Sequence, residues 1–218
     1  MVIDEQTDSK RSGSFWRELP ILLGVAILVA VLVRAFVLQT FYIPSPSMEH
    51  TLNVWDRVLV NKLVYDFREP RRGEIVVFKA PTDWQSGTEG EDFIKRIIGV
   101  SGDHVVCCDD QERLMINGHS LDEPYIYTDT DGTQDPAADE KFDITVPSGR
   151  LWVMGDHRSA SGDSLEHWEQ SDDNIQEATV KIDSVVGRAF TIFWPVSRAT
   201  WLSVPGEFEG VPDAAPAN

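Results

Sequence analysis

The chain has 218 residues, and 42% of them are hydrophobic, which suffices for one packed domain of ordinary size. It carries 36 acidic against 19 basic residues, a formal net charge of −17. Because phosphate binding requires a basic surface, this balance excludes nucleic acid as a natural partner. The acidity itself bears on solubility and leaves the fold open.

The first long feature is an apolar run from Leu19 to Leu38, interrupted only by Pro20, Gly24 and Arg34. A helix over this run is about 30 Å long, the thickness of the hydrocarbon core of a bilayer. A cleavable signal peptide has a shorter apolar region and a small-x-small cleavage site, which the following residues do not offer. The run therefore predicts a transmembrane helix over residues 19–38.

Basic residues set the expected orientation of this helix. Three precede the apolar run, whereas none lies between Arg34 and Arg57. The positive-inside rule then predicts a cytoplasmic tail over residues 1–18, with its first 14 residues disordered, and an extracytoplasmic domain over residues 39–202. The expected location is the plasma membrane, with a single pass.

The exported part is predicted to contain many short β-strands, because β-branched alternation recurs between turn signals. These strands are Arg57–Lys62, Glu74–Lys79, Asp92–Val100, His104–Cys108, Arg113–Asn117, Asp143–Val146, Leu151–Met154 and Val180–Trp194. Helical periodicity is almost absent, so the predicted fold class is mostly β and barrel-like. We expect an acidic excursion over about 107–150, solvated at 129–140, and a loose C-terminal tail over 203–218.

The two cysteines, Cys107 and Cys108, are adjacent. On a strand their side chains point to opposite faces, and a bond between neighbours requires a strained peptide. Two separate thiols are therefore favoured over a vicinal disulfide.

The sequence offers no metal or cofactor site. Its five histidines are scattered, without an HExxH pattern or a His/Cys/Asp cluster. His157 is the one candidate for a Ser-His-Asp triad, although a histidine in a turn is the simpler interpretation. Neither a GxSxG nucleophile elbow nor a P-loop occurs.

Lys95 stands out because it lies inside an apolar strand. Alternation places its side chain on one face with Phe93 and Ile97. If that face is buried, desolvation lowers the pKa of the amine and leaves a neutral base able to accept a serine proton. The alternative is an edge-strand lysine that reaches water.

Five segments together resemble, in order, the motifs of bacterial type I signal peptidases (leader peptidases), which are membrane-bound serine–lysine proteases. The resemblance covers most of residues 20–195, behind the predicted anchor. The segments are Ile43–Leu52, Asp56–Lys62, Arg72–Phe78, Phe93–Asp103 and Gly155–Asp163. The implied fold is the catalytic domain shared by signal peptidases and self-cleaving repressors.

The resemblance implies a role for several polar residues. Ser47 matches the nucleophile and Lys95 the general base, while Ser45 and the Ser47 backbone N–H match the oxyanion donors. The supporting residues are Ser161, which orients the lysine amine, Asp156, which pairs with Arg96, and Asp163, a second supporting acid.

The family cleaves preproteins after small residues, three and one positions before the scissile bond, so the implied partners are signal peptides of exported preproteins and the lipid bilayer. Limited apolar pockets discriminate against larger side chains. The candidate pocket residues, each of which has core packing as its alternative role, are Phe41, Ile43, Pro44, Met48, Leu52, Phe93 and Ile94.

The sequence departs from the family pattern at three places. His50 stands where proline is usual, Leu165 stands where an arginine usually partners the second aspartate, and Ser159 with Ala160 replaces Asp-Asn. We expect a looser turn after Ser47 and another partner, or exposure, for Asp163.

Two further interpretations stay open at this point. A specialised relative that processes pilin-like or conjugation proteins would share the same catalytic pair. A non-catalytic anchored β-domain would leave Ser47 and Lys95 dispensable and far apart.

Overall fold

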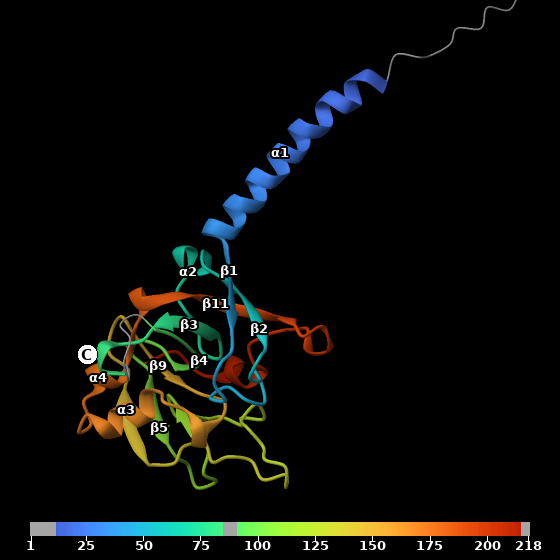
Figure 1. Cartoon of the computed structure of the whole chain (residues 1–218). Coiled ribbons are helices and arrows are strands. Elements are labelled where there is room, and N and C mark those ends of the chain that lie inside the picture. Colours follow the sequence, from blue (N-terminus) through green and yellow to red (C-terminus); the bar gives the residue numbers. More distant parts are fainter. Residues whose placement is uncertain (1–11, 85–90, 215–218) are drawn as a thin grey trace, which may run out of the picture. The chain divides into compact units, whose positions relative to one another are not determined.

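A computed structural model describes residues 12–84 and 91–214 of the chain (Figure 1). The chain divides into two compact units, Met1–Leu38 and Gln39–Asn218. Residues 1–11, which hold most of the predicted tail, lie outside the described residues.

The first unit contains helix α1 (Ser12–Phe36). The helix begins before the predicted start at residue 19 and ends before residue 38, because Leu38 opens strand β1 (Leu38–Tyr42). It also includes residues 12–14, which we expected to be disordered. By length and mean hydropathy, none of the helices within the described residues qualifies as a membrane span.

The second unit is built on a large sheet, as the mostly β prediction requires. Its described strands run in the order β1, β2, β11, β3, β4, β9 and β10, with β12 also paired to β11. After β1, the bounds are β2 (Arg57–Asn61), β3 (Ile75–Lys79), β4 (Asp92–Gly99), β9 (Arg150–Met154), β10 (Val180–Lys181), β11 (Val185–Trp194) and β12 (Thr200–Trp201). In this order the described end strands β1 and β10 do not pair, so the sheet is not a closed barrel.

A second, smaller sheet lies within the predicted excursion. Its described strands run in the order β7, β6, β5 and β8, and all of their pairings are antiparallel. The bounds are β5 (His104–Cys107), β6 (Leu114–Ile116), β7 (His119–Ser120) and β8 (Phe142–Thr145). Much of the excursion is therefore structured, and its apolar side chains share one core cluster with Ile98 of β4 and Trp152 of β9.

Short helices in the second unit escaped the sequence analysis, because four to seven residues are too few for a helical period to emerge. They are α2 (Val64–Phe67), α3 (Ser164–Gln170) and α4 (Ile175–Ala178). Single turns of 3-10 helix occur at Thr82–Trp84, Arg158–Ala160, Ile182–Ser184, Val196–Arg198 and Gly206–Gly210. The turn at Ile182–Ser184 splits the predicted strand Val180–Trp194 into β10 and β11.

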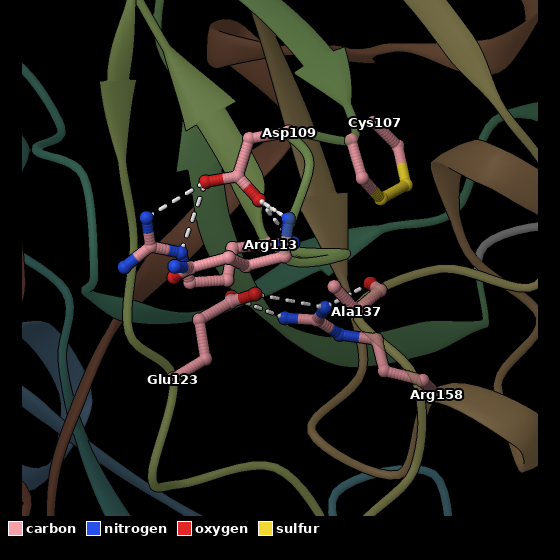
Figure 2. The surroundings of a disulfide bond; sticks show 8 residues. Cys107, Asp109, Arg113, Glu123, Ala137 and Arg158 are labelled. Atoms are coloured by element: carbon pink, nitrogen blue, oxygen red, sulfur yellow. Dashed lines mark hydrogen bonds and ion pairs between the residues drawn. A yellow bond between two sulfur atoms is a disulfide. The ribbon is translucent and has the colours of Figure 1, made fainter.

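The prediction of two free thiols is wrong. Cys107 and Cys108 form a vicinal disulfide, across a cis peptide bond (Figure 2). Strand β5 ends at Cys107, so the alternation of side chains that separates neighbours on a strand does not extend to Cys108.

The 129–140 segment is mostly exposed, as expected, and the Asp135 carboxylate accepts hydrogen bonds from the backbone N–H and the hydroxyl of Ser159. The expectation of a loose C-terminal tail needs correction. In the predicted loose tail, Phe208 and Val211 are buried in the core beneath the second sheet. Apolar side chains in a Pro- and Gly-rich segment are thus enough to hold it on the domain.

Candidate active site

The segment that follows β1 is held rigidly at both ends. Ile43 N–H donates to Asp56 O at 3.0 Å, and Trp55 N–H donates back to Ile43 O at 3.0 Å. Between these bonds Met48 and Leu52 are fully buried, so their side chains fasten the turn to the core. Ser47 is therefore carried on a turn fixed by the main chain and by apolar packing.

The two serines of this turn lie side by side. The Ser45 and Ser47 hydroxyl oxygens are 3.4 Å apart, and Ser47 is largely buried. Pro44 and Ser45 are exposed, so the approach to the pair lies on their side.

The turn after Ser47 explains why His50 replaces proline. His50 has a φ of 82°, a value that the pyrrolidine ring of proline cannot adopt. Its ring Nδ1 lies 2.8 Å from Ile126 O. The turn is thus tied by a side chain to a distant loop, which contradicts our expectation of a looser turn.

Lys95 lies in β4 and is only 3% exposed. Burial lowers the pKa of its amine from 10.5 to about 8, against the opposing effects of the Asp163, Asp156 and Glu166 carboxylates. Within the described residues, no hydrogen bond joins Lys95 Nζ to Ser47 or to Ser161. Lys95 is thus a buried amine whose neutral form is accessible near neutral pH.

The neighbouring Arg96 is fully engaged with Asp156. Its Nε and Nη2 donate to the two carboxylate oxygens at 2.8 and 2.6 Å, and Nη1 donates to Gly73 O. The guanidinium also stacks 4.1 Å from the Tyr125 ring centre, and Thr51 Oγ1 donates to Asp156. The pair predicted from sequence is present, and it links β4 to the turn that carries Ser47.

The segment that contains Asp156 also contacts the Ser47 turn directly. His157 N–H donates to Ser47 O at 3.2 Å. A methyl group at Gly155 would overlap both Ser47 O and Ser161 Oγ, so only glycine permits this approach. Residues 155–157 therefore bring Ser47 and Ser161 to one place, next to the strand that carries Lys95.

Asp163 finds its partners in the backbone. Its carboxylate accepts from Gly155 N–H at 2.8 Å and from Leu165 N–H at 3.0 Å, where it caps the first turn of α3. Leu165, which replaces the usual arginine, is buried in the core. Asp163 thus needs no arginine.

Ser161 has a buried hydroxyl without a hydrogen-bond partner among the described residues. With Asp163 and Glu166 it lines a cavity of about 360 Å³. Burying a hydroxyl without a hydrogen bond costs free energy, so Ser161 Oγ is a candidate to bond a group that moves or binds here.

A second buried ion pair, between Arg158 and Glu123, lies beside the site and was not predicted from the sequence. Arg158 Nη2 donates to Glu123 Oε1 at 2.6 Å, and the same guanidinium binds Ala137 O (Figure 2). Arg158 Nε also donates to Gly155 O. Glu123 and Arg158 lie 35 positions apart, and no local pattern marks their pairing.

The candidate pocket residues fall into three groups. Ile43, Met48 and Leu52 are buried in one core cluster, against which Phe41 and Ile94 pack while partly exposed. Phe93 packs on a different cluster, and Pro44 is exposed. Phe41 and Ile94 thus combine exposure with contact to the core below Ser47.

Comparison with known proteins agrees with these motifs. The family model described as "Signal peptidase, peptidase S26" matches residues 16–194. The chain is 38% identical over 213 residues to a probable signal peptidase I-2 from Synechocystis, covering 96% of this chain and 88% of that protein. It is 35% identical over 231 residues to a signal peptidase I from Mycobacterium tuberculosis, covering 89% and 77%.

A crystal structure of a signal peptidase I from Enterococcus faecalis is also similar. It matches with a TM-score of 0.40 and 28% identity, covering 56% of this chain and 97% of that one.

Proposed function

The chain belongs to the signal peptidase family, peptidase S26, and we propose that it removes signal peptides with Ser47 as nucleophile and Lys95 as general base. The observation that carries this mechanism is the burial of Lys95. A lysine with a pKa of about 8 holds a useful fraction of neutral amine near neutral pH.

In this mechanism Ser47 Oγ attacks the carbonyl carbon of the scissile bond while Lys95 Nζ accepts its proton. The resulting ammonium then protonates the leaving amine, and water hydrolyses the acyl-enzyme with the same base. Catalytic hydrogen bonds often tighten only when substrate binds, so the lack of a bond between Lys95 Nζ and Ser47 in the described residues is compatible with this sequence.

Ser45 Oγ and the Ser47 backbone N–H are the proposed oxyanion donors. The rigidity of the turn favours this role, because donors that need no reorganisation stabilise developing charge best. Ser161, whose buried hydroxyl has no other partner in the described residues, is the proposed group that orients the lysine amine. Asp156 and Asp163 hold the surrounding backbone and Arg96.

The substrate is proposed to bind as an added strand. Strand β9 pairs with β4 only from Arg96 onward, so none of the described strands covers this edge of β4 at Asp92–Lys95. An extended peptide can use such an edge for main-chain hydrogen bonds. Small side chains before the scissile bond would then face Phe41, Ile94 and the buried floor of Met48.

We also propose that residues 19–38 anchor the chain in a bilayer, with residues 1–18 cytoplasmic and the catalytic unit on the other side. Large apolar side chains along α1, including Leu19, Val25 and Val33, are exposed, which supports a lipid environment for them. In the second unit, exposed tryptophans support bilayer contact, because this side chain prefers the interface; they are Trp55, Trp194 and Trp201.

Protease accessibility in intact cells tests this topology. A protease added outside should digest the catalytic unit and spare an epitope fused before residue 1. Digestion of the epitope with protection of the catalytic unit would reverse the orientation.

The activity is tested with purified full-length protein in detergent and a preprotein that carries alanine at both small-x-small positions. The product should begin at the residue after the second alanine, and Ser47→Ala should bind but not cleave. The matched control is Ser159→Ala, which should retain activity. Undiminished cleavage by Ser47→Ala would refute the assigned nucleophile.

A further inference from the structure

His157 contacts the Ser47 turn at three points, and the proposed mechanism gives it no role. Its backbone N–H donates to Ser47 O at 3.2 Å. Its ring Nδ1 lies 3.2 Å from Pro46 O and 3.4 Å from a carboxylate oxygen of Glu49. Its ring stacks on Tyr127, with centres 3.8 Å apart and planes 16° from parallel.

The partners of Nδ1 determine which nitrogen carries the proton. A carbonyl oxygen and a carboxylate can only accept hydrogen bonds, so Nδ1 must donate. The stacked Tyr127 ring fixes the plane of the imidazole, and with it the direction of this N–H. The ring is thus a donor aimed at Pro46 O.

The bond to Pro46 O has a consequence for the next residue. A trans peptide unit is planar, and its C=O and N–H point in opposite directions. Pro46 O accepts this bond and one from Glu49 N–H at 2.8 Å, and together they fix the direction of Ser47 N–H, because Pro46 O and Ser47 N–H belong to one peptide unit. The His157 N–H bond to Ser47 O fixes the following unit in the same way.

The same short segment reaches the base. Asp156, which precedes His157, binds the side chain of Arg96, the residue after Lys95. Tyr127 N–H also donates to Asp156 O at 2.8 Å, which ties the stacking partner to the same backbone. The consecutive residues Asp156 and His157 thus hold both the Ser47 turn and strand β4, which carries Lys95.

We propose that His157 is a positioning residue that aims the Ser47 backbone N–H at the oxyanion formed on the substrate. This inference rests on the proposed function, in which Ser47 is the nucleophile. The oxyanion exists only in the transition state and in the tetrahedral intermediate, so loss of His157 should lower kcat with little effect on KM.

The test compares His157→Phe with His157→Asn in the full chain, using a peptide substrate with alanine at positions −3 and −1. Phenylalanine keeps the stack on Tyr127 and removes the donor, whereas the asparagine amide can donate from nearly the same place as Nδ1. His157→Phe should lose about 10- to 100-fold in kcat at unchanged KM. His157→Asn should retain most of the activity, and both should melt near the wild-type temperature.

A wild-type kcat in His157→Phe would overturn the proposal, as would equal losses in both variants or a loss confined to KM. If His157→Phe does not fold, Tyr127→Leu decides, because it frees the ring and keeps the donor. A smaller loss of kcat at constant KM is then expected, and an unchanged kcat would overturn the proposal. Activity in a parallel Ser47→Ala sample would instead refute the proposed function.

Discussion

The burial of Lys95 makes a prediction about the working pH of the proposed mechanism. Burial lowers the pKa of its amine to about 8, and the carboxylates of Asp163, Asp156 and Glu166 oppose that effect. A general base acts only when deprotonated. We therefore predict that kcat/KM rises about tenfold per pH unit below about 8 and levels off above it. A profile that is flat between about pH 5 and 9 would exclude a lysine base.

Glu166 offers a way to shift the acid limb of the kcat/KM profile, the part that rises below about pH 8, without changing Ser47 or Lys95. Its carboxylate raises the pKa of Lys95, and its side chain is exposed on α3. Glu166→Gln should therefore shift the acid limb of kcat/KM to lower pH. Glu209→Gln, at an exposed position of the Gly206–Gly210 turn, is the control and should leave the limb in place. A shift to higher pH in Glu166→Gln would contradict the assigned electrostatics.

At the residue scale, local patterns went only part of the way. Alternation around Lys95 grouped it with Phe93 and Ile97 on one face and left open whether that face is buried, and the structure shows that Lys95 is buried. The vicinal disulfide was missed because the strand ends at Cys107. The contacts of His157 with the Ser47 turn join residues more than 100 positions apart, and no local pattern encodes them.

Among the elements, α3 connects helix capping to the site. Asp163 caps this helix and also accepts from Gly155 N–H, beside Ser47. Asp163→Ala should therefore cost about 1–3 kcal/mol of stability and also lower kcat. Asn174→Ala is the matched control, since Asn174 caps α4 through Gln176 N–H away from the site. It should lose about 1 kcal/mol in denaturant unfolding and keep its activity.

Gly155 defines the closest approach between the strand β9 end and the nucleophile turn. An added methyl group would overlap Ser47 O and Ser161 Oγ, so Gly155→Ala must push these groups apart. We predict a loss of about 1–3 kcal/mol in stability and at least about tenfold in kcat. Gly206→Ala, where a methyl group meets nothing within 4 Å, should match wild type in both assays. Full activity in Gly155→Ala would show that catalysis does not depend on this close contact.

Most strands of the large sheet were predictable because each has β-branched alternation bounded by turns, as in β3 and β4. The short helices of the second unit were not, because α3 and α4 are stabilised by caps and tertiary packing over only a few residues. Strands β7 and β12 have two residues each and exist only through their partners. Local sequence therefore predicted the strands that are long enough to show β-branched alternation between two turns.

For the molecule as a whole, Lys95, the proposed general base, should reduce the stability of the fold. The unfolded chain binds a proton at Lys95 up to its ordinary pKa of 10.5, whereas the folded chain releases it at about 8. Between about pH 8 and pH 10.5 the unfolded chain binds more protons than the folded chain, so the free energy of unfolding rises with pH. Below about pH 8 the whole loss of stability caused by burying Lys95 is present. Lys95→Met should thus add up to about 3 kcal/mol at pH 7. The gain should vanish near pH 11, as measured by denaturant unfolding at both pH values.

The central claim is that the Lys95 amine is the base that activates Ser47, and the cleavage rate of Lys95→Ala tests it most directly. The substrate is a preprotein with alanine at −3 and −1, and the control is Lys181→Ala, an exposed lysine on β10. We predict a loss of about 100- to 10,000-fold in kcat for Lys95→Ala, with the fold intact and Lys181→Ala fully active. Cleavage by Lys95→Ala at the wild-type rate would contradict the account.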